Sequence, residues 1–297
     1  MFITVNGQLG SGKSEICRFY KEQHGFEVFS TGAIQREWAK QQGISTLEQN
    51  KKSLSDYSLD HYIDTSTVNY ARDNPEVDTI FDSRLAWHFV PRSFKIHLLV
   101  SPVVAAKRVY NNRKAEEEKY VDERDAMLQL ISRRAVEHER YLAVYGVDMY
   151  DFRNYDLILD TTSLGISEVC SFLYERSSRG YGDGKTRIYL SPANMLPTRK
   201  IGEADLKKAE AFADEIRAGR ALPPIGIIRV QDTVFIRDGH ARALGANLAG
   251  AKLVEAVLSD GDASPEAVGI TFADVADWEK ANGTRDTYVP PFLEERK

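Results

Sequence analysis

The stretch FITVNGQLGSGKS, residues 2–14, decides the fold of the first part of the chain. Phe2 to Val5 form an apolar run typical of a buried strand, and the residues from Gly7 to Ser14 fit the pattern G-x-x-x-x-G-K-[ST]. Glycines at this spacing let backbone N–H groups curl around a phosphate, and the helix expected from Lys13 adds the positive end of its dipole. The stretch therefore predicts a strand, a phosphate-binding loop and a helix, in that order.

The residue types in this loop indicate how a nucleotide would be held. Lys13 would reach the β- and γ-phosphates and take part in catalysis, and the Ser14 hydroxyl would bind Mg²⁺. ATP and Mg²⁺ are therefore the expected cofactors. The expected phosphate cradle consists of Gly7, Gly10, Ser11 and Gly12.

Apolar runs and helical patterns alternate from this loop to about residue 179. Beyond the first strand, strands are expected near 26–29, 79–81, 96–100 and 157–159. Helices are expected from Lys13 and over about 31–42, 47–73, 102–112, 122–144 and 166–178. Strands that alternate with helices predict an α/β fold with a mainly parallel sheet covered by helices on both faces.

Three further residues carry chemistry suited to phosphate transfer. Arg36 lies one turn inside a predicted helix, where its guanidinium could clamp an acceptor phosphate; the alternative is a solvated helix face. Asp82 and Arg84 follow a predicted strand, and the carboxyl ends of parallel strands face the ligand crevice. Asp82 could hold a water of Mg²⁺ and act in catalysis, and Arg84 could bind a base or phosphate. A strand-end turn with a surface ion pair is the alternative.

A row of charged side chains follows on the longest predicted helix. Arg133, Glu137, Arg140 and Tyr141 have spacings that place them on one helix face. Arg133 and Arg140 would close over the transferring phosphates as catalytic residues, and a salt-bridged solvated face is the alternative.

From residue 1 to about 170 the chain resembles cytidylate kinases of the short, archaeal-type branch of the nucleoside monophosphate kinases. The resemblance rests on GQLGSGKS, STGAIQREWAKQQGISTLEQN, DSRLAW, KIHLLVSPVVAAKRV and ERYLAVYGVDMYDFRNYDLILDTT. It implies a P-loop kinase fold and γ-phosphoryl transfer from ATP to a nucleoside monophosphate such as CMP or dCMP. It also implies that Arg36 and Arg84 bind the acceptor, and that Arg108 belongs to a mobile lid over the nucleotide.

Two departures from that family affect the acceptor pocket. The family usually has an acidic residue where this chain has Ala33, and a glycine where it has Ser83. The acceptor could therefore be a nucleoside monophosphate or another small phosphate acceptor. Two alternatives stay open: a kinase acting on a free hydroxyl of an amino acid or sugar alcohol, and a nucleotide sensor that controls a binding module.

The composition changes near residue 180. Three glycines within residues 180–184 mark a linker, and seven of the ten prolines follow it. We expect a kinase domain over 1–179, a linker over 180–185, a smaller α+β domain over 186–260 and a C-terminal extension over 261–297. In the smaller domain, strands are expected near 187–190, 225–230, 233–237 and 253–257, with helices near 203–218 and 240–249.

The run VFIRDGHARAL, residues 234–244, resembles the ParB/sulfiredoxin-like fold, including its free-serine kinases. The resemblance implies a second phosphate or nucleotide pocket made by Asp238, Gly239, His240 and Arg242. Sulfiredoxin has a cysteine where this chain has His240, and the free-serine kinases have a second histidine where it has Ala241. Binding or substrate shaping is therefore favoured over independent catalysis, and a neutral, turn-capping His240 is the structural alternative.

Composition excludes several classes of protein. The net charge of −5 argues against a nucleic-acid partner, which usually requires a basic face. No apolar run approaches 18 residues and the first residues have no signal-peptide pattern, so we expect a cytoplasmic protein without a membrane partner. Two cysteines provide no disulfide framework. The oligomeric state stays open, a homo-oligomer included.

Overall fold

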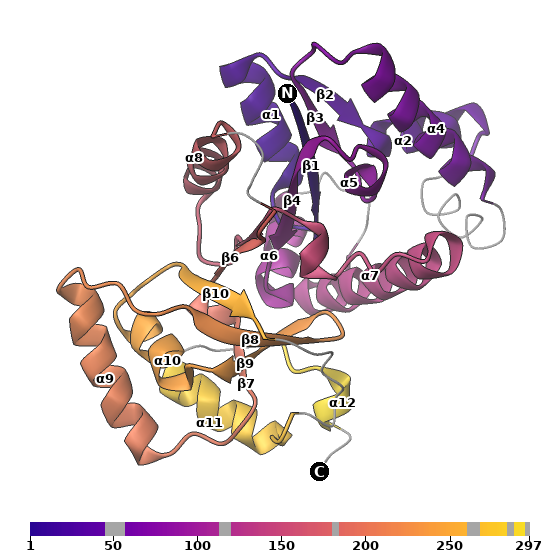
Figure 1. Cartoon of the computed structure of the whole chain (residues 1–297). Helices are drawn as coiled ribbons and strands as arrows, with labels where there is room; N and C mark the ends of the chain where they lie inside the picture. Colours follow the sequence, from indigo (N-terminus) through magenta and orange to yellow (C-terminus); the bar gives the residue numbers. More distant parts are fainter. Residues whose placement is uncertain (45–56, 113–119, 180–183, 260–267, 284–287, 295–297) are drawn as a thin grey trace. The chain divides into compact units, whose positions relative to one another are not determined.

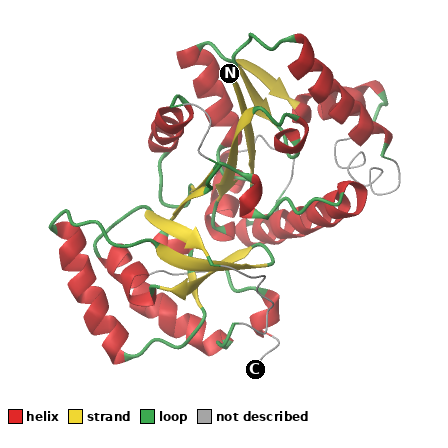
Figure 2. Ribbon diagram, in the orientation of Figure 1, coloured by secondary structure: helices red, strands yellow, loops and turns green. Residues whose placement is uncertain are grey.

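The computed structural model describes residues 1–44, 57–112, 120–179, 184–259, 268–283 and 288–294. Helices alternate with strands through most of this part of the chain, which confirms the predicted α/β class (Figure 2). The contacts within the chain define two compact units. The first comprises Met1–Leu98, Arg133–Leu157 and Gly165–Thr186, and the second comprises Leu99–Ser132, Ile158–Leu164 and Arg187–Lys297.

The first unit is built on a parallel sheet with the strand order β2-β3-β1-β4 (Figure 1). Its strands are β1 (Phe2–Gly7), β2 (Glu27–Ser30), β3 (Thr79–Asp82) and β4 (Ser93–Leu99). Because all four strands run in the same direction, their carboxyl ends lie at one edge of the sheet. Gly7, Ser30 and Asp82 end their strands there, so this edge carries three positions expected to face a ligand.

The strands form because their side chains are apolar on both faces. Ile3, Val5, Ile80, Ile96 and Leu98 have no exposed surface, as expected for a parallel sheet covered by helices. The flanking elements are α1 (Lys13–His24), α2 (Thr31–Gln41), α4 (Ser58–Asp73), α5 (Ala86–Phe89), the part of α7 (Glu123–Tyr145) from Arg133 on, the short 3-10 helix Phe152–Asn154 and α8 (Ile166–Ser177).

The second unit has a mixed sheet with the strand order β5-β6-β10-β8-β9-β7. Its strands are β5 (Leu157–Asp160), β6 (Arg187–Leu190), β7 (Leu196–Pro197), β8 (Ile225–Val230), β9 (Thr233–Asp238) and β10 (Val254–Leu258). The pairs β6–β10 and β8–β9 are antiparallel, and the pairs β8–β10 and β7–β9 are parallel. Its helices are α6 (Pro102–Asn112), the start of α7, a short 3-10 helix (Pro192–Asn194), α9 (Glu203–Arg217), α10 (His240–Leu248), α11 (Phe272–Asn282) and α12 (Pro291–Glu294).

Helices α9 and α10 pack closely because of one glycine. A Cβ atom at Gly245 would lie 2.7 Å from the carbonyl oxygen of Ala209 and 2.7 Å from the Cβ of Phe212. A larger residue there would force the two helices apart. The turn between β8 and β9 places Gln231 in a left-handed conformation (φ 53°).

Most predicted elements lie within a few residues of the observed ones. The helix expected over 47–73 is described only from Ser58, because residues 45–56 lie outside the described part, as do residues 180–183 of the expected linker. The sequence did not predict α5, β7, α12 or the two 3-10 helices, which are two to four residues long and too short to show a period. Among the described residues, no helix is long and apolar enough to cross a membrane.

Candidate active site

The phosphate loop begins where the backbone of β1 leaves its neighbour β4. At Gly7 a Cβ atom would lie only 2.6 Å from the Cβ of Leu98, so only glycine fits at this point. The amide of the next residue, Gln8, donates to the carbonyl oxygen of Leu98 at 2.9 Å. The loop is therefore fixed to the sheet at its first two residues.

The rest of the loop has the conformation that a phosphate cradle needs. Gly10 (φ 80°) and Gly12 (φ 95°) are left-handed, a conformation that favours glycine. Ser11 is buried, and its hydroxyl has no hydrogen-bond partner among the described residues. The first amides of α1, which begins at Lys13, have no acceptor within the helix. An anion such as a phosphate would satisfy these donors, so the loop fits the predicted nucleotide phosphates.

Two cations converge on the first residue of this loop. The Lys13 Nζ atom lies 3.5 Å from the Gly7 carbonyl oxygen, and the Arg84 guanidinium donates a hydrogen bond to the same oxygen. The pKa of Lys13 is lowered to about 8, mainly by burial and also by nearby Arg84, whereas Asp82 and Glu137 act in the opposite direction. The predicted donor-side residue Lys13 and the predicted acceptor-side residue Arg84 thus share one location.

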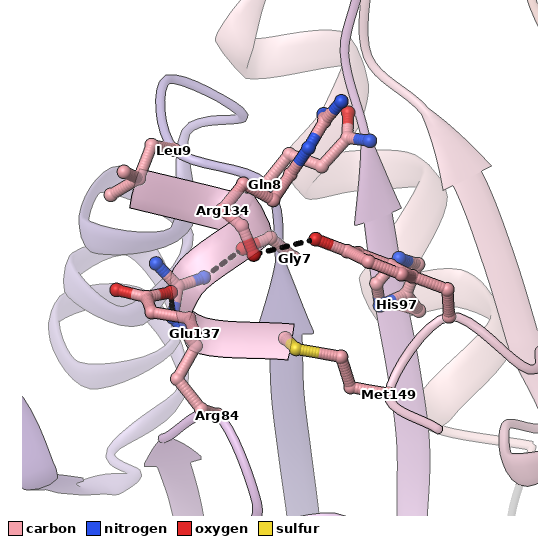
Figure 3. A pocket seen from close by; sticks show the side chains of 9 residues that line it. Gly7, Gln8, Leu9, Arg84, His97, Arg134, Glu137 and Met149 are labelled. Carbon is pink, nitrogen blue, oxygen red and sulfur yellow. Dashed lines mark hydrogen bonds and ion pairs between the residues drawn. The ribbon is translucent and has the colours of Figure 1, made fainter. Parts of the chain in front are cut away.

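Glu137 links Arg84, beside which it lies in Figure 3, to Arg133. Its carboxylate lies 3.0 Å from the Nε of Arg84 and 3.0 Å from the Nε of Arg133, and 14% of its side chain is exposed. Burial raises the pKa of Glu137, but Arg84 and Arg133 outweigh it, and the net shift is downward. Glu137 is therefore ionised and bridges two predicted site residues.

A pocket opens beside this bridge (Figure 3). It is lined by Gly7, Gln8, Leu9, Arg84, His97, Arg134, Glu137, Met149 and Tyr150. The Tyr150 hydroxyl donates to the Arg134 carbonyl oxygen at 3.1 Å and so ties the segment after α7 to that helix. The sequence reasoning missed His97, Met149 and Tyr150, because they come from segments that only the fold brings to the phosphate loop.

The residues expected to hold Mg²⁺ are one hydroxyl and one carboxylate. Ser14 is exposed in the first turn of α1, and Asp82 ends β3, where its carboxylate accepts a hydrogen bond from the Ser30 hydroxyl at 3.5 Å. The described residues contain no group of three or more His, Cys, Asp and Glu side chains suited to a metal ion. This donor set suits Mg²⁺, which usually takes one or two protein oxygens together with substrate phosphates and water.

Arg36 and Arg140 are placed differently from the Arg84 and Arg133 pair. Arg36 is exposed on α2 and makes no ion pair with the described residues. Arg140 is largely buried on α7, donates to the Tyr141 hydroxyl at 3.1 Å and lies 3.8 Å from the Asp60 carboxylate. Burial raises the pKa of Asp60, and Arg140 only partly offsets this effect.

Arg108 belongs to the second unit, where it is already hydrogen-bonded. Its guanidinium donates to the Thr161 hydroxyl (3.1 Å), the Thr161 carbonyl oxygen (2.7 Å) and the Leu164 carbonyl oxygen (3.3 Å). Burial lowers its pKa, and Asp160 opposes that effect. Arg108 thus fixes the segment after β5, and its predicted role at the nucleotide stays a prediction.

The four residues of the predicted second pocket lie together at the start of α10. Gly239 is left-handed (φ 93°), and Arg242 donates to Asp238 at 2.6 Å and to the Pro223 carbonyl oxygen at 3.3 Å. His240 is buried, and its Nε2 accepts a hydrogen bond from the Thr198 amide at 3.2 Å.

Burial and the nearby Arg199 lower the pKa of His240 to about 4. The lowered pKa favours a neutral His240, whose ring nitrogen accepts from the Thr198 amide, and phosphate binding by this group stays a prediction.

Comparison with known proteins identifies the family. Residues 2–163 of the 297-residue chain match the model of the cytidylate kinase-like family. The chain belongs to the cytidylate kinase-like family. It is a P-loop kinase, with its phosphate loop between β1 and α1 and its sheet parallel around that loop.

Individual relatives agree with this assignment over the same part of the kinase. Cytidylate kinase of Methanocella arvoryzae is 30% identical over 175 residues, which cover 59% of this chain and 95% of that protein. Cytidylate kinase of Pyrobaculum arsenaticum is 32% identical over 169 residues, 56% of this chain and 86% of that protein. An S-adenosylmethionine-dependent nucleotide dehydratase of Lacinutrix mariniflava is 32% identical over 174 residues, 58% of this chain but only 35% of that longer protein.

Proposed function

We propose that this P-loop kinase transfers the γ-phosphoryl group of ATP, with Mg²⁺, to CMP or dCMP. The observation that carries the proposal is the convergence of Lys13 and Arg84 on the Gly7 carbonyl oxygen, at the start of the phosphate loop. Two cations at that point suit a reaction in which negative phosphates are brought together. The names of the cytidylate kinase relatives support a nucleoside monophosphate as the acceptor.

In the proposed reaction an oxygen of the acceptor phosphate attacks the γ-phosphorus of ATP, and the bond to the β-phosphate oxygen breaks. Lys13 would contact the β- and γ-phosphates, and the loop amides with the Ser11 hydroxyl would hold them in place. When bound between Ser14, Asp82 and the phosphates, Mg²⁺ would neutralise charge on the transferring group. The transferring and acceptor phosphates would be faced by Arg84, Arg133 and Arg140. Arg36 would bind the acceptor. Catalysis is then positioning and charge neutralisation.

The departure at Ser83 is compatible with a nucleotide acceptor. The Ser83 side chain is buried, and its hydroxyl accepts hydrogen bonds from the amides of Leu85 (3.3 Å) and Ala86 (3.2 Å). The hydroxyl therefore caps the start of α5 and is already hydrogen-bonded to backbone amides. Ser83 is thus used within the fold, so this departure from the family pattern does not argue against CMP or dCMP as the acceptor.

For the C-terminal part we propose an appended nucleotide- or phosphate-binding domain over 186–260, followed by the extension over 261–297. Its support is the left-handed Gly239 before α10 with Arg242 one turn away, a geometry that leaves helix amides available to an anion. The Lacinutrix relative supports the combination of such a kinase segment with further chain, since the match covers only 35% of that protein.

A panel of acceptors with ATP and Mg²⁺ tests the function. Wild type and Lys13→Ala are each incubated with CMP, dCMP, UMP, AMP, serine and a sugar alcohol, and product is measured by mass. Product with CMP or dCMP that disappears in Lys13→Ala supports the proposal. Product only with a hydroxyl acceptor would replace it by the alternative kinase, and ATP binding without turnover on any acceptor would point to a nucleotide sensor.

A further inference from the structure

The carboxylate of Glu137 lies between the guanidinium groups of Arg84 and Arg133. Figure 3 shows Glu137 beside Arg84 in the lining of the pocket. Arg84 is held at two points, by Glu137 on its Nε and by the Gly7 carbonyl oxygen on a terminal nitrogen. Arg133 is held through its Nε, one helical turn before Glu137 on α7. Glu137 therefore contributes to the orientation of both arginines.

This carboxylate is surrounded by positive charge. Lys13, Arg84, Arg133 and Arg140 all interact electrostatically with Glu137. Asp82 is a second carboxylate that acts on Lys13. An anionic substrate that enters this region meets the cations and also the negative charge of Glu137, which lines the same pocket.

Two opposite effects follow from this geometry. A guanidinium fixed by a carboxylate has fewer orientations, so it meets a phosphate in a defined direction and needs no reorganisation during the reaction. The same carboxylate repels phosphates and competes for the N–H groups that they would bind. A positioning role should therefore favour turnover and disfavour anion binding.

We propose that Glu137 is a positioning residue that orients Arg84 and Arg133 for phosphoryl transfer and, through its own charge, weakens the binding of anionic substrates. The proposal rests on the proposed function for the meaning of turnover, but its effect on affinity is measured by binding alone. If the ion pairs of Glu137 were purely structural, removing the carboxylate would weaken both Mg·ATP binding and turnover. The proposal instead expects tighter binding together with lower turnover.

The test compares Glu137→Gln, Glu137→Asp and a matched control, Glu139→Gln. Glu139 lies on α7 two residues away and is exposed. Binding of Mg·ATP is measured by calorimetry, and kcat is measured with the acceptor that the wild type uses in the panel. In Glu137→Gln we expect Mg·ATP to bind about 10-fold more tightly, because one nearby negative charge is removed. We expect kcat to fall about 10- to 100-fold, because the two arginines lose their orientation.

Glu137→Asp keeps the charge and shortens the side chain. We expect its Mg·ATP affinity to stay near that of the wild type while kcat falls, and Glu139→Gln to change neither. Weaker or unchanged Mg·ATP binding in Glu137→Gln, or an unchanged kcat, would overturn the proposal.

If thermal unfolding shows that Glu137→Gln does not fold, Glu137→Asp decides, and tighter binding or full turnover in that variant would overturn the proposal. If the wild type phosphorylates no acceptor in the panel, the proposed function and the predicted effect of Glu137 on kcat are both refuted. The predicted effect of Glu137 on Mg·ATP affinity is still tested by the binding measurement.

Discussion

Lys13 is the side chain on which the proposed chemistry most depends. It sits at the start of α1 and reaches back to the Gly7 carbonyl oxygen. Loss of one positioned cation beside a developing phosphoryl charge should cost at least about 10²-fold in rate. We therefore expect Lys13→Ala to lose turnover but to remain folded, since this side chain serves the phosphates and not the core. Steady-state kinetics and thermal unfolding check this, with the exposed Lys21→Ala on the same helix as control; full turnover in Lys13→Ala would remove the loop from the reaction.

Gly7 shows how closely the loop and the sheet approach each other. Gly7→Ala would place a Cβ atom 2.6 Å from the Cβ of Leu98, so β1 and β4 would have to separate locally. Such overpacking should lower the free energy of unfolding by about 1–3 kcal/mol and displace the loop. Denaturant unfolding and ATP binding measure the two effects. Gly202→Ala is the control, because nothing lies within 4 Å of a Cβ atom there; equal behaviour of the two variants would contradict the assigned role of Gly7.

Arg84 and Arg36 are both proposed to bind the acceptor, but their surroundings differ. Replacing either arginine by lysine keeps the charge and removes the planar fork, so we expect a higher KM for the acceptor with little change in ATP affinity. The effect should be larger for Arg84→Lys, which also loses the guanidinium contact with Glu137, than for Arg36→Lys at an exposed position. Initial rates with each substrate varied in turn give both constants, and a fall in ATP affinity alone would reverse the assignment of these arginines.

The start of α10 has a built-in pH dependence. His240 is buried and neutral, with its pKa lowered from 6.5 to about 4 mainly by burial. The unfolded state therefore binds a proton between about pH 6.5 and 4 that the folded state does not bind. Stability should be intact above pH 6.5 and decline as the pH falls toward 4, by up to about 3 kcal/mol. Denaturant unfolding across this pH range measures the decline in stability. His240→Gln keeps an acceptor for the Thr198 amide and should make the decline less steep. An equally steep decline in that variant would show that other groups cause the pH dependence.

The elements show what could be predicted from the sequence. Apolar runs predicted the strands, and the motif from Gly7 to Ser14 predicted the loop and a helix start near Lys13, where α1 begins. Glu137 was placed on the correct helix face, but spacing on one helix could not reveal that it bridges to Arg84, 53 positions earlier. His97 and Tyr150 carry no motif, since their place in the pocket follows only from how β4 and the segment after α7 pack.

Part of the family segment folds in one unit with the C-terminal segment. The end of β5 and the residues after it, Ile158–Leu164, group with Arg187–Lys297. Asp160 accepts a hydrogen bond from the side chain of Asn194 at 2.9 Å, and the hydroxyls of Ser163 and Ser191 lie 2.6 Å apart. Asp160 and Ser191 are buried, so these contacts cannot be replaced by water without opening the unit.

Removal of the C-terminal segment should therefore weaken the kinase segment. Burial raises the pKa of Asp160, and hydrogen bonds from Thr162 and Asn194 partly offset this shift. A fragment ending at Thr186 would lack Asn194 and so remove one of these hydrogen bonds. Loss of such a buried partner costs about 1–3 kcal/mol, to which the lost apolar contacts add. We expect the fragment to unfold at a lower temperature than the full chain and to have lower turnover, and Asn194→Ala in the full chain to show the smaller, single-contact part of that loss. Calorimetry and the acceptor assay on the three proteins test this; a fragment as stable and as active as the full chain would show that the two segments fold and act independently.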